Sequence, residues 1–581
     1  MECGEICKGK HRYARENKKK VSGVWLYNKK IRALALLCAG IVCAAAVALF
    51  VRGEALRQRK DSEGAAVYSA KIPVISLQGS FPLQKKRQMT CARFAFAYAG
   101  EERAYYAWTE LQGMSSNLFP KKSYRLRFVT DTDKTKRRTA TFNGLLADGA
   151  ADTEYYLKAN YADRTLARNV VAAKLWSEMA ASREGLDRHL AALPYHGALT
   201  GFPVLLSVNG AYQGVYTLNM AKTPKNLGMD GLAGKYAGYG AEGGEQDSFC
   251  AAVRNVSDYE DMSYAGHIAL DTDDWYTICA SDTSQEGKRR IEDSLTELFQ
   301  FVKNADDEAY AKGLSAYIDI PAAVDYLLLL YYLEANDNSN KNVVLITYDG
   351  KKWIHSAYDL DTTFGMTWNG EDVLPINYLL PSADGESSGT GKLFWDRFLT
   401  AYADKLRERY IALRETLFTE EKLLSAFDEF AETIPAEAWA REDALWEGLP
   451  PEGLTQRDQL RAFLKYRTML LDAYFGFDAG GTKLTGEMER GQRAEVSDGE
   501  TADTASQGIT AGTYAELADT LDEAYRSEFA AQEKEERQSS ALMRLLTRAS
   551  LYGAPLAFAL CFAGLFFAYL YAARRQKGHG R

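Results

Sequence analysis

The sequence predicts an α+β fold in which a β-rich N-terminal lobe precedes a helical C-terminal lobe, with a transmembrane helix on either side. Segments with strand alternation and turn signals dominate residues 72–219, and segments with helical periodicity dominate residues 292–475. The membrane helices are predicted because residues 33–51 and 549–573 contain no charged side chain and are long enough to cross a bilayer.

Composition places the 581-residue chain among globular proteins, with 46% hydrophobic and 25% charged residues. The formal net charge is −8 although both ends of the chain are basic, so the region between them is strongly acidic. This balance argues against a nucleic-acid partner. Eight cysteines and six histidines show no zinc-binding spacing, so a zinc centre or a catalytic histidine cluster is not expected.

Charge and composition also divide the chain. Basic tails flank the two apolar segments on their outer sides, so the positive-inside rule predicts that both termini are cytoplasmic and that the main domain is extracytoplasmic. The predicted units are a basic tail (1–32), a transmembrane helix (33–51), the main domain (72–475), a flexible linker (476–512), a charged helix (513–548), a second transmembrane helix (549–573) and a basic tail (574–581). Cleavage of the first apolar segment as a signal peptide stays open.

Strands are predicted in the first part of the main domain, and a hairpin is predicted around the Asn209-Gly210 turn. The predicted strand from Tyr155 to Asn160 leads into a helix from Thr165 to Met179. A strand lysine ahead of a helix is an arrangement that positions nucleotide phosphates, so Lys158 and Arg168 at this junction are candidates for binding a nucleotide. The GxGxxG pattern at residues 238–243 precedes no clear helix and is interpreted as a loop.

The second part of the main domain contains helices and one short strand pair. An apolar helix begins at Pro321 and ends near Asp337, and three helices follow between residues 393 and 475. Between these helices, residues 343–348 and 351–358 are predicted strands joined by the Asp349-Gly350 turn.

This hairpin brings four oxygen-bearing side chains together. Asp337 and Asn342 lie in the loop before the first strand, and Asp359 and Asp361 follow the second strand. A hairpin returns the chain to its starting point, so Asn342 and Asp359 are expected to be close. Hard oxygen ligands of this kind predict a site for a divalent metal ion.

The order and spacing of these residues match phosphoryl-transfer enzymes. In protein kinases a catalytic Asp is followed five residues later by a metal-binding Asn, and a second metal-binding Asp comes later in the chain. Asp337, Asn342 and Asp359 reproduce that order, although the HRD and DFG motifs are absent. Phosphoryl transfer needs a carboxylate to orient the acceptor hydroxyl and oxygen ligands to hold a metal ion against the phosphates.

Several sequence blocks resemble one family. ANDNSNKN, the strand pair and YDLDTTFG resemble the core of the CotH family, the spore coat protein H-like secretory kinases. KSYRLRF, YLKANYADRTLARN, NGAYQGVY and FLKYRTMLLDAYF resemble other blocks of that family, so the resemblance covers most of residues 72–475. Where the family often has a Glu after the Gly-x-Tyr hairpin, this chain has Asn219.

The resemblance implies an atypical protein-kinase-like fold that uses ATP and Mg²⁺ or Mn²⁺ to phosphorylate proteins of the cell envelope or spore coat. By the same resemblance Asp337 matches the catalytic Asp, Asn342 and Asp359 match metal ligands, and Asp361 matches the second acidic residue of a DxD motif.

Three alternatives stay open at this point. Asp359-Leu360-Asp361 is also the DxD motif that holds manganese and a nucleotide sugar in glycosyltransferases, which place it after a parallel αβ sheet. A second alternative is a non-catalytic, membrane-anchored coat or envelope scaffold. The third is a kinase-like protein that binds nucleotide without transferring phosphate.

Overall fold

A computed structural model gives the structure of the chain. The described residues are 71–84, 88–113, 115–130, 139–142, 151–223, 225–229, 251–255, 276–278, 285–339, 342–370, 373–378, 380, 393–446, 456–477 and 516–528.

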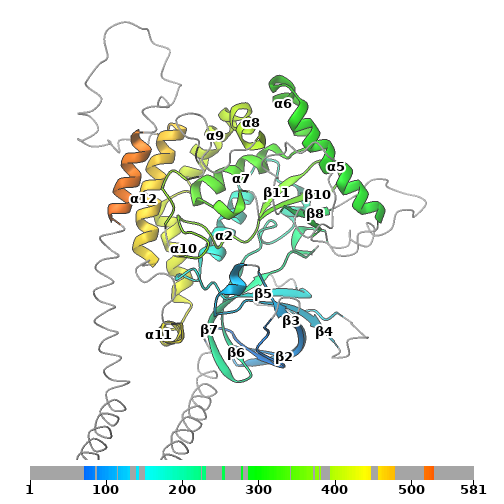
Figure 1. Cartoon of the computed structure of the whole chain (residues 1–581), viewed down its shortest axis with the longest axis vertical. Coiled ribbons are helices and arrows are strands. Elements are labelled where there is room, and N and C mark those ends of the chain that lie inside the picture. The colour runs from blue at the N-terminus through cyan, green and yellow to red at the C-terminus, as the bar shows by residue number, and fades with distance from the viewer. Residues whose placement is uncertain are drawn as a thin grey trace, which may run out of the picture.

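Seven strands form a barrel at one end of the molecule (Figure 1). They are β1 (Val74–Gln78), β2 (Met89–Tyr98), β3 (Glu101–Leu111), β4 (Tyr124–Val129), β5 (Glu154–Lys158), β6 (Gly201–Val208) and β7 (Ala211–Met220). Their spatial order is β1-β2-β3-β4-β5-β7-β6, and a parallel pairing of β1 with β6 closes the barrel. Closure leaves no unpaired strand edge in this sheet.

Alternation along β5 decides which side chains reach the helical part of the molecule. Tyr155 and Leu157 belong to the cluster of buried residues inside the barrel, which is rich in aromatic rings. Successive residues of a strand point to opposite faces, so Tyr156 and Lys158 lie on the outer face. The end of β5 therefore presents Lys158 toward the second half of the molecule.

The closed barrel corrects the predicted fold class. We expected the β-rich lobe of a kinase-like fold, and the structure has a closed barrel instead. The physical reason is the contact between β1 and β6, which pairs Val74 with Leu205 and Leu77 with Val208. This pairing joins segments that are far apart in the sequence, and local strand patterns do not encode it.

Helices make up most of the other end of the molecule (Figure 1). They are α2 (Arg168–Ala181), α3 (Arg188–Ala191), α5 (Gln285–Asn304), α6 (Asp307–Gly313), α7 (Ile320–Leu333), α8 (Leu393–Ala401), α9 (Ala403–Arg414), α10 (Glu420–Glu432), α11 (Ala436–Leu445), α12 (Gln456–Phe475) and the helical residues 516–528. Together α2, α7 and α12 supply much of the main hydrophobic core.

Every residue of the central helix α7 except Pro321 is buried. Asp319 caps its first turn by accepting a hydrogen bond from the backbone N–H of Ala322 at 2.9 Å, and Pro321 occupies the first turn, where its missing N–H costs nothing. The helix ends at Glu334, which adopts a left-handed conformation with φ 52°. That C-cap turns the chain toward Asp337.

A second sheet, in the order β11-β10-β8-β9, lies beside α7. Its strands are β8 (Ala251–Asn255), β9 (Tyr276–Ile278), β10 (Val343–Thr347) and β11 (Ile354–Ala357). The predicted hairpin is confirmed, because β10 and β11 pair antiparallel with Val343 opposite Ala357.

The predicted membrane helices and localisation need a correction as well. No helix among the described residues is long and apolar enough to cross a membrane. The two segments on which the prediction rested, residues 33–51 and 549–573, lie outside the described residues. The GxGxxG pattern at residues 238–243 also lies outside them.

Candidate active site

Five of the six predicted site residues come from three places in the fold, and the sixth, Arg168, lies at the start of α2. Asp337 lies in a short 3-10 turn (Asn336–Asn338) after α7, and Asn342 directly precedes β10. Asp359 and Asp361 follow β11 at the same end of the hairpin, because its register pairs the residue after Asn342 with Ala357. Lys158 reaches this end from the last position of β5.

Asp337 and Asn342 hold each other in place. The Nδ2 group of Asn342 donates to Oδ2 of Asp337 at 3.3 Å, and the backbone N–H of Asn342 donates to the carbonyl oxygen of Asp337 at 3.2 Å. The loop between them is therefore closed by two hydrogen bonds. This closure fixes the direction of the Asp337 carboxylate relative to β10.

Lys158 forms an ion pair with Asp359 that joins the barrel to the second sheet. The Lys158 side chain is 5% exposed and that of Asp359 is 23% exposed. Asp359 has φ 61°, a left-handed conformation that costs most non-glycine residues energy but that Asp tolerates. Local strain of this kind is frequent at functional sites.

The raised pKa of Asp361 indicates an excess of negative charge at the site. The surroundings together raise the pKa of its carboxyl group to about 7: burial has the largest effect, the charge of Asp359 also raises the pKa, Lys158 opposes the rise, and Asp337 adds to it. The residue as a whole is half-buried, and the charges of Asp359, Lys158 and Asp337 act on its carboxyl group. Three acidic side chains gathered near Lys158 favour the binding of a cation.

The residue types at the site fit a divalent metal ion, but their side chains do not surround a common point in this structure. Carboxylate and amide oxygens are the ligands that Mg²⁺ and Mn²⁺ prefer. Among the described residues, no three His, Cys, Asp or Glu side chains lie close enough together to hold a metal ion. The ion pair between Lys158 and Asp359 gives one reason, since it directs Asp359 toward the lysine.

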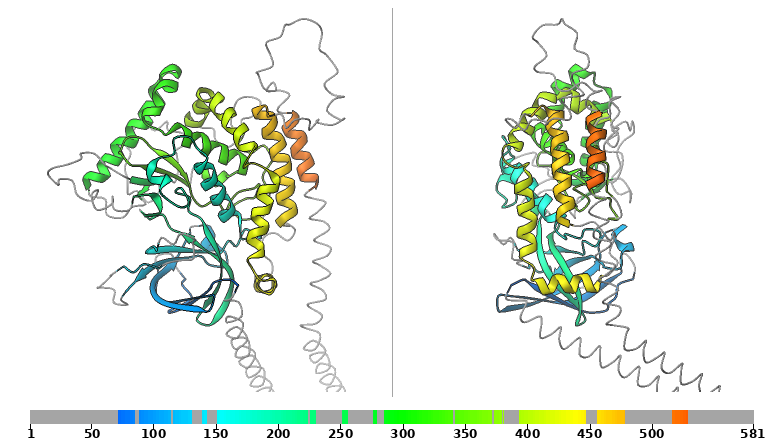
Figure 2. Two further views of the ribbon diagram at one scale, coloured as in Figure 1. Left: turned by 180° about the vertical axis from the view of Figure 1, so that it is seen from behind. Right: turned by 90° about the vertical axis from the view of Figure 1, so that its left-hand side faces the viewer.

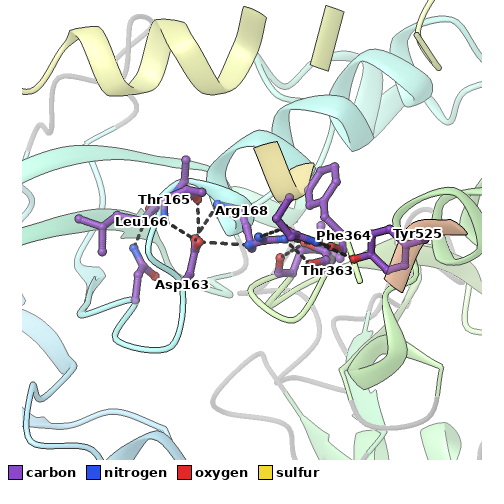
Figure 3. Close-up of polar contacts among 11 residues, drawn as sticks. Asp163, Thr165, Leu166, Arg168, Thr363, Phe364 and Tyr525 are labelled. Carbon is purple, nitrogen blue, oxygen red and sulfur yellow. Dashed lines mark hydrogen bonds and ion pairs between the residues drawn. The ribbon is translucent and has the colours of Figure 1, made fainter. Parts of the chain in front are cut away.

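A buried network fixes the backbone of the acidic segment (Figure 3). Arg168, at the start of α2, donates from Nη1 to the carbonyl oxygens of Thr363 and Phe364 at 2.8 and 3.2 Å. Its Nε donates to Asp163 at 3.1 Å, and its Nη2 donates to Gln459 at 2.7 Å. Burial lowers the pKa of Arg168, and Asp163 opposes that shift.

These contacts bear on the predicted role of Arg168. Its side chain is 3% exposed and is engaged by groups of the protein itself, so it does not point at an open site. The prediction that it binds nucleotide gains no support from this position. The geometry favours a structural role, in which Arg168 holds the loop that follows Asp361.

Comparison with known proteins gives the family. A family model described as CotH kinase protein matches residues 110–471, which is more than half of the chain. The chain belongs to the CotH kinase protein family. Comparison with curated proteins found no match. The CotH match contains every predicted site residue, whereas β1, β2 and the helical residues 516–528 lie outside it.

Four further residues support the CotH site and were not among the predicted site residues. Asn169 accepts a hydrogen bond from the backbone N–H of Leu360 at 2.9 Å, between the two aspartates. Asn338 donates to the carbonyl oxygen of Tyr358 at 2.6 Å. The other two are Gln459, in the Arg168 network, and Lys222, whose Nζ lies 3.3 Å from the centre of the Tyr358 ring.

The sequence contained a partial signal for these residues. Asn169 and Asn338 lie inside the two blocks that carry the family resemblance, next to predicted site residues. Gln459 had no signal, because α12 is far from the site in the sequence.

The antiparallel pairing of β10 with β11 ahead of Asp359 differs from the parallel αβ sheet expected of a DxD glycosyltransferase.

Proposed function

We propose that the chain is an ATP-dependent protein kinase that transfers the terminal phosphoryl group of ATP to a protein hydroxyl with the help of Mg²⁺ or Mn²⁺. Membership of the CotH kinase protein family supports the reaction class. The observation that carries the proposal is the meeting of Lys158 from the barrel with Asp359, beside two more carboxylates at the ends of β10 and β11.

Asp337 is proposed to act on the acceptor. Its carboxylate, oriented by Asn342, accepts a hydrogen bond from the hydroxyl of the protein substrate and takes its proton. The acceptor oxygen forms a bond to the γ-phosphorus while the bond from that phosphorus to the β–γ bridging oxygen breaks. ADP leaves with that oxygen, and the phosphorylated protein is the second product.

Lys158 is proposed to bind the ATP phosphates. It is nine-tenths buried at the site, so an anionic phosphate oxygen that reaches it meets a poorly solvated positive charge. Lys222 lies over the ring of Tyr358, the residue before Asp359, and provides a second positive charge on the same side. We assign both lysines to nucleotide phosphates.

Asn342, Asp359 and Asp361 are proposed to hold the metal ion, which when bound would neutralise phosphate charge during transfer. Asp359 has to leave Lys158 to serve as a ligand. A phosphate group at Lys158 compensates that lysine at the same time, so nucleotide and metal binding are expected to reinforce each other. Asn169 and Arg168 keep the backbone of residues 360–364 in place during this exchange.

The proposal is tested with the full chain, its Asp337→Asn and Asp359→Asn variants, and Asp404→Asn as a control. Asp404 is an exposed acidic residue in the first turn of α9, far from the site in the sequence. ATP binding is measured by calorimetry with Mn²⁺, and transfer is measured from γ-labelled ATP to a general protein acceptor.

We expect Asp337→Asn to bind ATP like the wild type and to lose about 10²-fold or more in transfer rate. Asp359→Asn should lose both transfer and the dependence of ATP binding on Mn²⁺. The control should match the wild type. Equal transfer by all four proteins would contradict the proposal, and ATP binding without transfer by the wild type would favour a non-catalytic nucleotide-binding protein.

The substrate proteins stay a proposal. We propose that the acceptors are proteins of the cell envelope or spore coat, in keeping with the family resemblance, and that nucleic acid is not a partner. Comparison of phosphoproteins between cells with and without the gene tests this assignment. Acceptors found only among proteins of other kinds would contradict it.

A further inference from the structure

The helical residues 516–528 lie against α12, although they fall outside the family match (Figure 2). Four side chains at helical spacing, those of Leu517, Ala518, Leu521 and Tyr525, are at most 5% exposed. Tyr525 packs against Phe463 of α12 with ring centroids 6.4 Å apart. This segment therefore docks through one apolar face and is part of the folded domain.

The first polar contact of this helix joins the Arg168 network (Figure 3). Nε2 of Gln459 donates to the hydroxyl oxygen of Tyr525 at 3.0 Å and to the carbonyl oxygen of Phe364 at 2.9 Å. Oε1 of the same amide accepts from Arg168 at 2.7 Å, which fixes its orientation. Tyr525 thus completes the set of contacts that hold the loop two to three residues after Asp361.

The second polar contact holds the same loop further along. Oδ1 of Asp522 accepts a hydrogen bond from the backbone N–H of Ile376 at 2.7 Å. The carbonyl oxygen of Ile376 accepts from Nη1 of Arg467, which also lies 3.3 Å from Glu334 at the end of α7. Ile376 is therefore held on one side by the docked helix and on the other by a residue that contacts the cap before Asp337.

Backbone conformation in this loop leaves little freedom for adjustment. Phe364 has φ 58° and Gly365 has φ 76°. A Cβ atom at Gly365 would lie 2.6 Å from the Phe463 ring and 3.1 Å from the Tyr525 hydroxyl. The chain at residues 364–365 is thus pressed against α12 and Tyr525 in a left-handed conformation that external contacts maintain.

We propose that residues 516–528 are a positioning element of the active site, in which Tyr525 and Asp522 act as positioning residues for the backbone of residues 363–365 and of Ile376, which follow Asp361. This inference rests on the proposed function for its catalytic consequence only. Neither residue touches substrate or metal. Their effect passes through Gln459 and Arg168 on one path and through Ile376 on the other.

The test uses the full chain and three variants. Tyr525→Phe removes only the hydroxyl that accepts from Gln459. Asp522→Ala removes the acceptor for Ile376, whereas Asp522→Asn keeps an oxygen acceptor at that position. Hydrogen–deuterium exchange of peptides covering residues 363–376 is measured first, because it requires no catalytic activity. Mn²⁺ binding and phosphoryl transfer are measured next.

We expect Tyr525→Phe and Asp522→Ala to speed exchange in 363–376 by about tenfold and to raise the Mn²⁺ concentration for half-saturation by about fivefold. Asp522→Asn should stay close to the wild type in both measurements. Faster exchange confined to 516–528, with the loop unchanged, would overturn the inference, as would equal effects of Asp522→Ala and Asp522→Asn. If the wild type transfers no phosphate, the proposed function fails, but the exchange results still decide the positioning role.

Discussion

Replacing Lys158 with Met should strengthen the binding of Mn²⁺ to the nucleotide-free protein. Lys158 is paired with Asp359 in the structure, so a metal ion has to compete with a buried lysine for that carboxylate. Met has a similar length and no charge. The variant therefore releases Asp359 without opening a large cavity.

The magnitude follows from the geometry. Two unit charges about 4 Å apart at an effective dielectric constant of about 20 interact by about 4 kcal/mol. Asp359 keeps 23% of its side chain exposed, and solvent screens part of that energy. After this screening we use about one third of the interaction energy. Removing that competition should raise the affinity for Mn²⁺ by about tenfold.

The assay is calorimetric titration with Mn²⁺ in the absence of ATP. Loss of Lys158 raises the pKa of Asp361 above its value of about 7, so the titration is run at pH 8.5 to keep that carboxyl group ionised. Lys405→Met, at an exposed position of α9, is the control. ATP affinity in the presence of Mn²⁺ should fall by about tenfold or more in Lys158→Met. Unchanged or weaker Mn²⁺ binding by a folded Lys158→Met protein would refute the assignment of Asp359 as a ligand that Lys158 restrains.

Three other predictions concern stability. Burial and the nearby charge of Arg183 lower the pKa of His355 to about 3. Below about pH 6.5 the unfolded chain therefore binds a proton at this histidine that the folded protein does not bind. The free energy of unfolding should fall there by about 1.4 kcal/mol per pH unit. The ring of His355 packs on Tyr326, and His355→Phe should flatten this slope in denaturant titrations between pH 4 and 7; an unchanged slope would exclude His355 as the cause. Asp325 is fully buried between Arg183 and Arg409, so Asp325→Asn should cost about 3–5 kcal/mol of unfolding free energy, and a loss under about 1 kcal/mol would show that the arginines find other partners. Gly214 has φ 105°, and a Cβ atom there would lie 2.1 Å from Oε2 of Glu442. Gly214→Ala should therefore displace Glu442 from its buried ion pair with Lys121 and lower the midpoint temperature of thermal unfolding by several degrees. An unfolding midpoint equal to that of the wild type would contradict this.

Local patterns predicted the parts of the fold that depend on near neighbours. The Asn209-Gly210 hairpin, the β10–β11 hairpin and the capped helix α7 all form as predicted, because turn residues, alternation and caps lie within a few positions of each other. Strand β3 has a weaker local signal. Its first residues, Glu101 to Arg103, are charged and exposed, so no apolar alternation marks its beginning.

Long-range contacts explain what could not be predicted. Closure of the barrel depends on β1 meeting β6, and neither strand carries a signal for its parallel partner. Arg168 shows the same limit within the site. Its contact with nucleotide stays a prediction, and the protein groups that it binds, Thr363 and Gln459, come from distant segments that only the fold brings together. The docked helix at 516–528 was expected as part of a charged helix, and its buried face was not anticipated.

The most direct test of phosphoryl transfer is a single-turnover measurement with the full chain, saturating ATP, Mn²⁺ and a protein acceptor, comparing the wild type with Asp337→Asn. We expect the wild type to transfer labelled γ-phosphate to the acceptor, and we expect the variant to bind ATP equally well but to transfer the phosphate at least about 10²-fold more slowly. Transfer at the same rate by both proteins would contradict the role of Asp337, and with it the proposed mechanism.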